Sequence, residues 1–353
     1  MIDLKSTNNL TNGSQGIVNS TSEPDIPKFS TSTVVLSSLF VVILIILTIF
    51  GNVLVIMAFK TFRRMRQVTN YFVASLAVTD ILVAVIAMPI WVAYLITGPL
   101  WVFDTVLQML WTSTDIMSGI ASIWHLTFVS IDRYLCIASS LKYRSIMTNV
   151  RAVFIILGIW LYSIVIASVA PTLWAWRGYS LVVTLLNFII PVIVISIAYF
   201  RIFQLARYHA HQIELSLGGK HGRFFKKELK ATKTLAVVIG AFLICWSPFF
   251  GLNLSYYICG CPPSPVIVAI AKWAHYGNSC LNPLIYGVMN KEFRRAFKKL
   301  LAPYLPVNAP NILTTNGGLN SASRQSVDTG QHQAIYQLRN SGEMEEQHRS
   351  SSL

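Results

Sequence analysis

Residues Trp111 to Tyr134 read WTSTDIMSGIASIWHLTFVSIDRY, an apolar stretch with one acid near its start and an acid–base pair at its end. Arg133 follows Asp115 by 18 residues, so in an α-helix the two side chains lie about five turns and about 27 Å apart on one side. The hydrocarbon core of a bilayer is about 30 Å thick. The stretch therefore predicts a membrane-spanning helix with a buried acid towards one membrane face and a charged pair at the other.

The composition of the chain also indicates a membrane protein. Of its 353 residues, 54% are hydrophobic and 12% are charged, and this charged share is about half that of a typical soluble protein. The net charge of +14 would suit a nucleic-acid partner. The Lys and Arg residues, however, lie in short segments between apolar blocks, where the positive-inside rule places them. We therefore expect no nucleic-acid binding.

Seven apolar segments of helical length follow one another along the chain and predict an all-α fold, a seven-transmembrane helix bundle. Lys and Arg are concentrated in the first, third and fifth connections, which predicts an extracellular N-terminus and a cytoplasmic C-terminus. The expected spans are residues 33–59, 68–95, 102–136, 149–171, 178–207, 230–258 and 265–289.

The chain outside the spans is expected to form three further parts. Residues 1–32 are polar and contain three Asn-x-Ser/Thr sequons, which predict an extracellular glycosylated tail or arise by chance in a segment rich in Asn, Ser and Thr. Residues 290–301, which follow the transmembrane domain 33–289, predict a short amphipathic helix on the membrane lipid. Residues 302–353 predict a disordered cytoplasmic tail. The sequons are at Asn9, Asn12 and Asn19.

Polar side chains within the expected spans are costly to bury, so a functional role is their default interpretation. Asp80 lies in the second span, Ser122 in the third, and Asn278 and Asn282 lie one turn apart in the seventh. Their oxygen atoms suit a small hard cation such as sodium. A hydrogen-bond network without an ion explains the same residues, and the sequence leaves both interpretations open.

Asp115 admits three interpretations: it pairs with a basic side chain, it is protonated, or it binds the cation of a ligand. Lys272 in the seventh span is the basic candidate on that side of the membrane. A ligand ammonium would also be favoured by aromatic rings around it, although an aromatic stripe is often plain core. Our hypothesis is that a cation is sensed at Asp115 and read out at Arg133. Aromatic residues recur at helical spacing in the sixth and seventh spans, at Phe242, Trp246, Phe249, Phe250, Trp273 and Tyr276.

With these residues in view, the chain resembles the rhodopsin-like G-protein-coupled receptors, and among them the biogenic-amine receptors. The resemblance covers roughly residues 33–301 and involves every expected span. It depends on motifs in order along the chain: Gly51-Asn52, Leu76-Ala77 with Asp80, Asp132-Arg133-Tyr134, Trp160, Phe188 with Pro191 and Tyr199, Cys245-Trp246-Ser247-Pro248-Phe249-Phe250, and Asn282-Pro283-Leu284-Ile285-Tyr286.

The resemblance implies a ligand site and an activation mechanism. A ligand ammonium would bind Asp115 above Trp246, and the other ligand-site residues would be Ile116, Gly119, Thr184, Asn187, Phe249, Phe250, Asn253, Trp273 and Tyr276. At rest Arg133 would be held by Asp132 and Glu228, and it would be released to engage a heterotrimeric G protein. The remaining residues of this change would be Ile123, Tyr134, Pro191, Tyr199, Phe242, Asn282, Pro283 and Tyr286.

The resemblance further implies a plasma-membrane location, with arrestin and receptor kinases as further partners. It implies no enzymatic activity, and the sequence contains no GxSxG or HExxH motif. The C-terminal residues Ser351-Ser352-Leu353 fit a PDZ-binding ending. The alternatives are a receptor of the same fold for a peptide or lipid, or a membrane transporter, although we find no internal repeat of the transporter kind.

The sequence departs from the family pattern at the extracellular side. The family places a cysteine near the start of the third span, bonded to another in the second extracellular loop. Here Gln108 stands at that position, and the loop is only a few residues long, around Thr172–Arg177, without a cysteine. Such a disulfide contributes a few kcal/mol. Cys259 and Cys261 predict either a tight loop disulfide or two free thiols.

The identity of the amine is less well defined by the sequence. Catecholamine receptors usually carry serines on the fifth span, whereas this chain has Val183, Thr184 and Asn187 on that face. Asn187 resembles a residue that some histamine receptors direct towards the imidazole ring. Histamine, serotonin, octopamine and tyramine are therefore the candidate ligands, with histamine first among them.

Overall fold

The structure is a computed structural model, and all but the last two described residues belong to one compact unit, which ends at Ala302. The sequons, Cys261, the Glu228 side chain and the PDZ-like ending lie outside the described residues, so the expectations for them stay predictions. The side chains of residues 177 and 208–231 are not described either. The described residues are 30–97, 104–139, 142–173, 176–215, 220–260 and 264–304.

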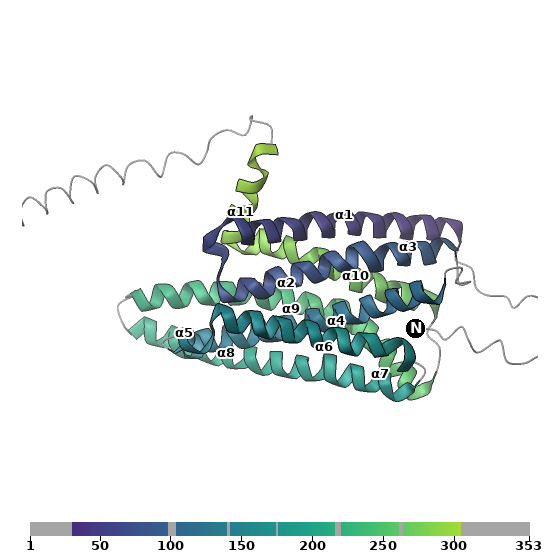
Figure 1. Ribbon diagram of the computed structural model, residues 1–353. Coiled ribbons are helices and arrows are strands. Elements are labelled where there is room, and N and C mark those ends of the chain that lie inside the picture. Colours follow the sequence, from purple (N-terminus) through teal and green to yellow (C-terminus); the bar gives the residue numbers. More distant parts are fainter. Residues whose placement is uncertain are drawn as a thin grey trace, which may run out of the picture. The chain divides into compact units, whose positions relative to one another are not determined.

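The described residues form helices and contain no strand, and the long helices run side by side as a bundle (Figure 1). The predicted all-α, seven-helix fold is confirmed. The bounds are α1 Thr31–Thr61, α2 Val68–Leu82 continued by η3 Val83–Ala87 and α3 Met88–Thr97, α4 Thr105–Ala138, α6 Asn149–Leu173, α7 Arg177–Thr184 continued by η4 Leu185–Ile189 and α8 Ile190–Leu215, α9 Lys220–Cys259, and α10 Pro265–Met289. Shorter helices are η2 Arg63–Met65, α5 Tyr143–Ile146, α11 Lys291–Leu301 and η5 Ala302–Tyr304.

The helix bounds follow the sequence closely at α10, which occupies the predicted residues 265–289. Its start is set by local chemistry: Ser264 accepts a hydrogen bond from the Ile267 N–H as N-cap, and Pro265 occupies the first turn. The largest difference is at α9, which begins at Lys220 and not at residue 230. The polar residues before 230 therefore extend the helix beyond the apolar block.

Two of the long helices contain a π-helical turn just before a proline: α2 with η3 and α3, and α7 with η4 and α8. The turn Val83–Ala87 precedes Pro89, and the turn Leu185–Ile189 precedes Pro191. Proline lacks the N–H of a regular helix and its ring clashes with the preceding turn, and a π-turn accommodates the extra backbone there. The second of these turns carries Asn187, one of the predicted ligand-site residues.

Five of the helices, each taken together with any π-helical turn in it, contain a segment long and apolar enough to cross a membrane. These segments are Thr31–Thr61, Val68–Thr97, Asn149–Leu173, Gly178–Arg207 and Thr232–Cys259. The other two, α4 and α10, carry several buried charged and amide side chains, which lower their apolar content. These side chains are Asp115, Asp132, Arg133, Lys272, Asn278 and Asn282. Because α4 packs against α2, α6, α8 and α9, its polar residues lie inside the bundle.

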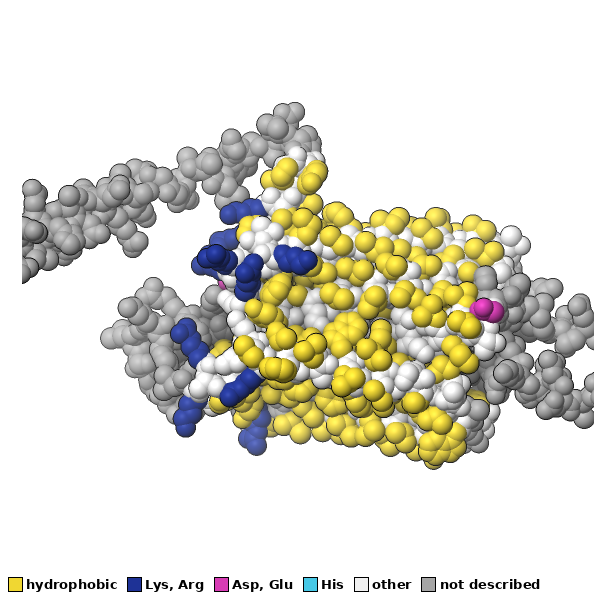
Figure 2. All heavy atoms as spheres, viewed as in Figure 1, with side chains coloured by type: hydrophobic (Ala, Val, Ile, Leu, Met, Phe, Trp, Pro, Cys, Tyr) yellow, Lys and Arg dark blue, Asp and Glu magenta, His cyan; other side chains and the backbone are white. Residues whose placement is uncertain are grey.

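The surface of the bundle has the pattern of a membrane protein. Large hydrophobic side chains on α1, α6 and α8 are exposed, among them Leu36, Phe154 and Phe200. Figure 2 shows such side chains along the length of the bundle, with Lys and Arg gathered at one end. That end is where α1 finishes and α11 begins (Figure 1). Basic side chains therefore mark one face of the membrane.

Helices α1 and α10 meet closely at Gly51, where an added Cβ would lie 2.8 Å from the Pro283 side chain. Asn52 joins the two helices by donating hydrogen bonds to the carbonyl oxygens of Thr48, at 2.9 Å, and Ser279, at 3.0 Å. The absence of a side chain at Gly51 allows the two helices to approach closely, and the hydrogen bonds of the Asn52 amide hold them there. This junction positions α10 at the level of Asn282.

Candidate functional site

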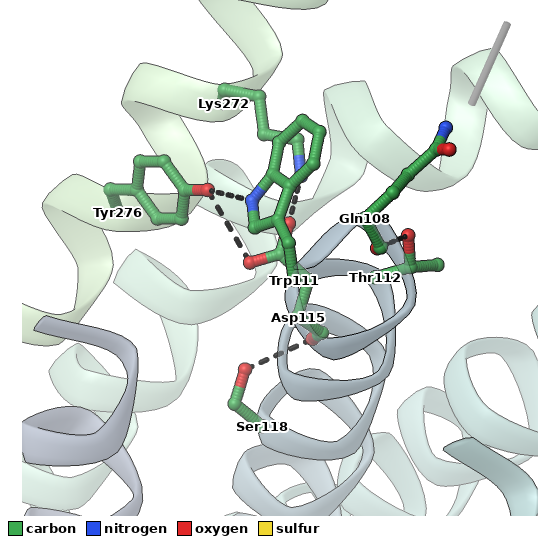
Figure 3. A network of polar contacts seen from close by, with 7 residues as sticks. All are labelled: Gln108, Trp111, Thr112, Asp115, Ser118, Lys272 and Tyr276. Carbon is green, nitrogen blue, oxygen red and sulfur yellow. Dashed lines mark hydrogen bonds and ion pairs between the residues drawn. The ribbon is translucent and has the colours of Figure 1, made fainter. Parts of the chain in front are cut away.

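Asp115 on α4 and Lys272 on α10 form an ion pair in the interior of the bundle. Lys272 Nζ contacts Asp115 Oδ2, and the two residues are only 8% and 5% exposed. The hydroxyl of Tyr276 lies 3.4 Å from the other carboxylate oxygen (Figure 3). Of the three interpretations that the sequence left open for Asp115, the structure therefore shows the first, a pair with a basic side chain.

Aromatic rings surround the Lys272 ammonium. Its Nζ lies 4.9 Å from the centroid of Trp111, 5.6 Å from that of Tyr276 and 5.8 Å from that of Phe249. All three distances are within the range of cation–π attraction. Trp111 also donates a hydrogen bond of 3.3 Å to the Tyr276 hydroxyl (Figure 3). The site thus holds a primary ammonium between a carboxylate and three aromatic rings.

Trp111 is the ring that sequence reasoning missed. It precedes Asp115 by four residues, one helical turn, so it lies on the same face of α4. That spacing could have identified Trp111, but aromatic residues around the cation were predicted only in the sixth and seventh spans. Phe249 and Tyr276 were predicted in the ligand site and do lie beside the cation. The predicted Trp273 instead packs edge-on against Phe40 of α1, with ring centroids 6.0 Å apart.

A layer of rings lies next to the ion pair. Trp246 is 3% exposed and stacks on Phe242, with centroids 5.5 Å apart. The ring of His275 lies 3.9 Å from Trp246, and a Cβ at Gly119 would overlap the indole. Since His275 is one turn beyond Lys272 on α10, contacts lead directly from the ion pair to Trp246. Gly119, predicted in the ligand site, and Phe242, predicted to couple to Trp246, thus both lie against the Trp246 ring.

Polar side chains on α7 and η4 make hydrogen bonds within the bundle. The Thr184 hydroxyl donates to the Ser180 carbonyl oxygen at 2.8 Å, and Asn187 Oδ1 accepts from Trp124 Nε1 at 3.2 Å. The Asn253 carbonyl accepts from the Ser180 hydroxyl at 3.3 Å. Ile116 belongs to a cluster with residues of α6 and α7, while Phe250 packs on Trp246. These five positions therefore contact neighbouring residues of α4, α6, α7 and α9.

At the opposite end of α4, Asp132 holds Arg133. Asp132 Oδ2 accepts hydrogen bonds from Arg133 Nη2 at 2.6 Å and Nε at 3.0 Å, and from the Thr69 hydroxyl at 2.7 Å. Tyr143 donates to Oδ1 at 2.6 Å. Burial, and then the charge of Asp132, raises the pKa of Tyr143, so its hydroxyl stays a donor. Asp132 and Arg133 are thus paired as predicted.

The other predicted activation residues lie around this end or within the central core. The buried hydroxyls of Tyr199 and Tyr286 have no hydrogen-bond partner among the described residues, and Tyr286 stacks on Phe293 of α11. Ile123 is fully buried and belongs to one cluster with Phe242 and Trp246. Tyr134 is half-buried, and Pro191 and Pro283 are buried in α8 and α10.

The Asp80 cluster also forms as the sequence predicts. Asn282 Nδ2 donates to Asp80 Oδ2 at 2.9 Å, and Ser122 and Asn278 are buried. Asn278 Oδ1 has no hydrogen-bond partner among the described residues. The Asp80–Asn282 hydrogen bond is compatible with both interpretations that the sequence left open, the ion-free network and a site whose oxygen atoms hold a hard cation.

A second polar node, which sequence reasoning missed, joins α2, α4 and α6. Ser75 Oγ accepts a hydrogen bond of 2.9 Å from Trp160 Nε1 and lies 2.8 Å from His125 Nε2. The other ring nitrogen of His125 lies 2.6 Å from the Ala121 carbonyl oxygen. Both ring nitrogens of this buried histidine are thus engaged. The node ties together the helices that position Asp115.

The connection between α6 and α7 is as short as the sequence predicts. Helix α6 ends at Leu173 and α7 begins at Arg177, and the Trp176 N–H donates to the Leu173 carbonyl at 3.0 Å. Asp104 caps α4 by accepting from the Leu107 N–H. Gln108 stands at the position of the family cysteine. Its backbone carbonyl oxygen accepts a hydrogen bond of 2.8 Å from the Thr112 hydroxyl. Cys259 is exposed.

Comparisons with known proteins agree with this architecture. The family model of the 7 transmembrane receptor (rhodopsin family) matches residues 51–180 and 170–286. The histamine H2 receptor of Homo sapiens is 34% identical over 292 residues, which cover 77% of this chain and 80% of that receptor. The octopamine receptor beta-1R of Drosophila melanogaster is 34% identical over 310 residues, 74% of this chain and 61% of that receptor. This chain therefore belongs to the rhodopsin family of seven-transmembrane receptors.

Proposed function

We propose that the chain is a cell-surface receptor for a small amine, that the ligand ammonium binds Asp115, and that binding activates heterotrimeric G proteins. The observation that carries this proposal is the primary ammonium of Lys272, which occupies the Asp115 carboxylate within three aromatic rings. It stands where a ligand ammonium would. Receptors named for histamine and octopamine are among the relatives, and the family is one of receptors and not of enzymes.

A ligand ammonium reaches Asp115 only if the Lys272 ammonium moves away. The site therefore has two states, one closed by the internal pair and one in which the ligand replaces it. A ligand shifts such an equilibrium by its preference for one state, with coupling energies of about 1–3 kcal/mol. Lys272 lies one turn from His275, whose ring contacts Trp246. Exchange at Asp115 is thus coupled to α9, where Pro248 interrupts the helix.

The basic end of the bundle supports the orientation of the receptor. Lys and Arg side chains gather there (Figure 2), and the positive-inside rule assigns such an end to the cytoplasm. This orientation puts Arg133 at the G-protein side and the N-terminus outside. In α11, Phe293 is buried against the bundle and Lys298 is exposed, which suits a helix on the inner leaflet. Arrestin, receptor kinases and a PDZ protein are proposed as further cytoplasmic partners.

A ligand panel tests the proposal. The receptor is expressed in cultured cells, exposed to histamine, octopamine, tyramine, serotonin and related amines, and followed by cAMP and calcium. We expect at least one amine to give a concentration-dependent response that untransfected cells lack. Silence towards every amine, with the receptor labelled at the cell surface, would contradict an amine function.

We also propose that the Asp80 cluster binds sodium, held by oxygens of Asp80, Ser122, Asn278 and Asn282. Asn278 Oδ1, which accepts no hydrogen bond from the described residues, supports this fit. A bound sodium ion would supply a positive charge opposite the buried carboxylate. At ten times its dissociation constant, an ion that binds only the folded state stabilises it by about 1.4 kcal/mol. The purified receptor should therefore melt at a higher temperature in NaCl than in KCl, and Asp80→Asn should remove the difference. Equal melting temperatures of the unaltered receptor would argue against the ion.

A further inference from the structure

We propose that the natural ligand is a zwitterion, such as an amino acid, whose ammonium binds Asp115 and whose carboxylate binds Lys272. This inference rests on the proposed amine function and narrows it to a ligand class. It starts from an observation that a site for simple amines does not explain. The carboxylate that would receive the ligand is already neutralised by a lysine of the chain.

The charge balance of the site distinguishes the two ligand classes. Asp115 and Lys272 together carry no net charge, and both are buried. A monoamine that takes Asp115 adds one positive charge and leaves the lysine ammonium unpaired, which is costly in a buried position. A zwitterion adds one charge of each sign. It separates the internal pair into two new pairs, and the site stays neutral.

The displaced lysine finds no second carboxylate nearby among the described side chains. The other described acids are Asp80, Asp104, Asp132 and Glu292. Asp104 precedes Asp115 by 11 residues, or about 16 Å along α4, and Asp132 follows it by about 25 Å. Asp80 is bound to Asn282, which follows Lys272 by about 15 Å along α10. Since none of these described acids lies near Lys272, a ligand carboxylate would supply the anion that receives it.

The geometry of the pair suits such an exchange. Asp115 and Lys272 project from two different helices and meet directly, so a ligand with adjacent opposite charges that separated them would have a partner on each helix. The lysine has a flexible four-carbon stem that lets its ammonium follow a carboxylate. Trp111, Phe249 and Tyr276, which now flank the lysine ammonium, would flank the ligand ammonium in its place. The Tyr276 hydroxyl stands beside the second oxygen of Asp115.

The alternative explanation of the Asp115–Lys272 pair is purely structural: it is a clamp that holds α4 and α10 together. A clamp predicts that loss of Lys272 changes the potency of all ligands by the same factor. The zwitterion site predicts a change of selectivity, because only ligands with an anion lose a partner. The ratio of potencies within a matched pair of ligands separates the two explanations.

The test uses matched ligands that differ in the carboxylate: histamine and histidine, tyramine and tyrosine, serotonin and 5-hydroxytryptophan, and the methyl ester of each amino acid. Full-length wild-type receptor is compared with Lys272→Met and with Lys272→Arg, which keeps the charge. Lys60→Met repeats the substitution at an exposed lysine outside the site. Each variant is quantified at the cell surface, and Lys272→Gln replaces Lys272→Met if the latter does not reach it.

We expect at least one amino acid to activate the wild-type receptor at least tenfold more potently than its amine or its ester. Lys272→Met should shift this ratio by about 100-fold towards the amine, since removing one partner of a buried charge pair has an effect of this size. Lys272→Arg and Lys60→Met should retain the wild-type preference. Equal shifts for amine and amino acid, or a wild-type preference for amines, would overturn the inference and leave the amine function standing. If neither the wild-type receptor nor any variant responded to any ligand, both this inference and the amine function would be overturned.

Discussion

Replacing Asp115 with asparagine is expected to abolish the response to the activating ligand. The amide has nearly the same shape but no charge, so the ligand ammonium would enter the aromatic site without a counter-ion. Removing one partner of a buried ion pair costs about 3–5 kcal/mol, and each 1.4 kcal/mol is a factor of ten in affinity. We therefore expect at least about a 100-fold rise in EC50, measured by cAMP or calcium in cells with quantified surface receptor.

The control for this variant follows from the ion pair. Asp115→Asn also leaves Lys272 without its partner, which by itself destabilises the folded receptor. The double variant Asp115→Asn/Lys272→Met removes both charges and should restore surface expression. It should still fail to respond, because no carboxylate remains for the ammonium. A double variant with the wild-type EC50 would rule out Asp115 as the ammonium site.

Replacing Arg133 with alanine is expected to abolish G-protein activation and to leave ligand binding unchanged. Arg133 lies about 27 Å from Asp115 along α4, so it does not contact the ligand. At rest Asp132 holds it by two hydrogen bonds, and in the active state the freed guanidinium would bind the G protein. We expect no nucleotide exchange above baseline on a purified heterotrimer, with a ligand dissociation constant equal to that of the wild type.

Arg144→Ala supplies the matched control, because Arg144 is exposed on α5 at the same end of the bundle. Its loss should reduce coupling far less than the loss of Arg133. Asp132→Asn should have the opposite sign and raise basal exchange, since it weakens the bonds that hold Arg133 at rest. Full nucleotide exchange by the Arg133→Ala receptor would show that the readout of the signal lies elsewhere.

Much of the fold could be predicted from the sequence because the signals are local. Apolar block length defined the helices, and at α10 the predicted residues 265–289 coincide with the helix in the structure. Helical spacing correctly placed Asp115 and Arg133 on α4. The bounds of α9 were predicted less well, because the helix continues through polar residues that carry no apolar signal.

The sequence offered Lys272 as a candidate partner of Asp115, but it could not decide between that pair, a protonated acid and a ligand cation. Periodicity shows which face of a helix a residue occupies, but not which neighbouring helix that face meets. Lys272 lies 157 residues away in the sequence, and its contact with Asp115 depends on how α4 and α10 pack. The same limit applies to Asn187: its place in the ligand site stays a prediction, and the hydrogen bond that its side chain accepts from Trp124 of α4 could not be inferred from the sequence.

An experimental structure of the receptor with its activating ligand tests most directly whether a ligand ammonium replaces Lys272 at Asp115. We expect the ligand nitrogen about 3 Å from an Asp115 carboxylate oxygen, with the Lys272 ammonium displaced from that oxygen. A ligand bound elsewhere, above an intact Asp115–Lys272 pair, would contradict the proposed site.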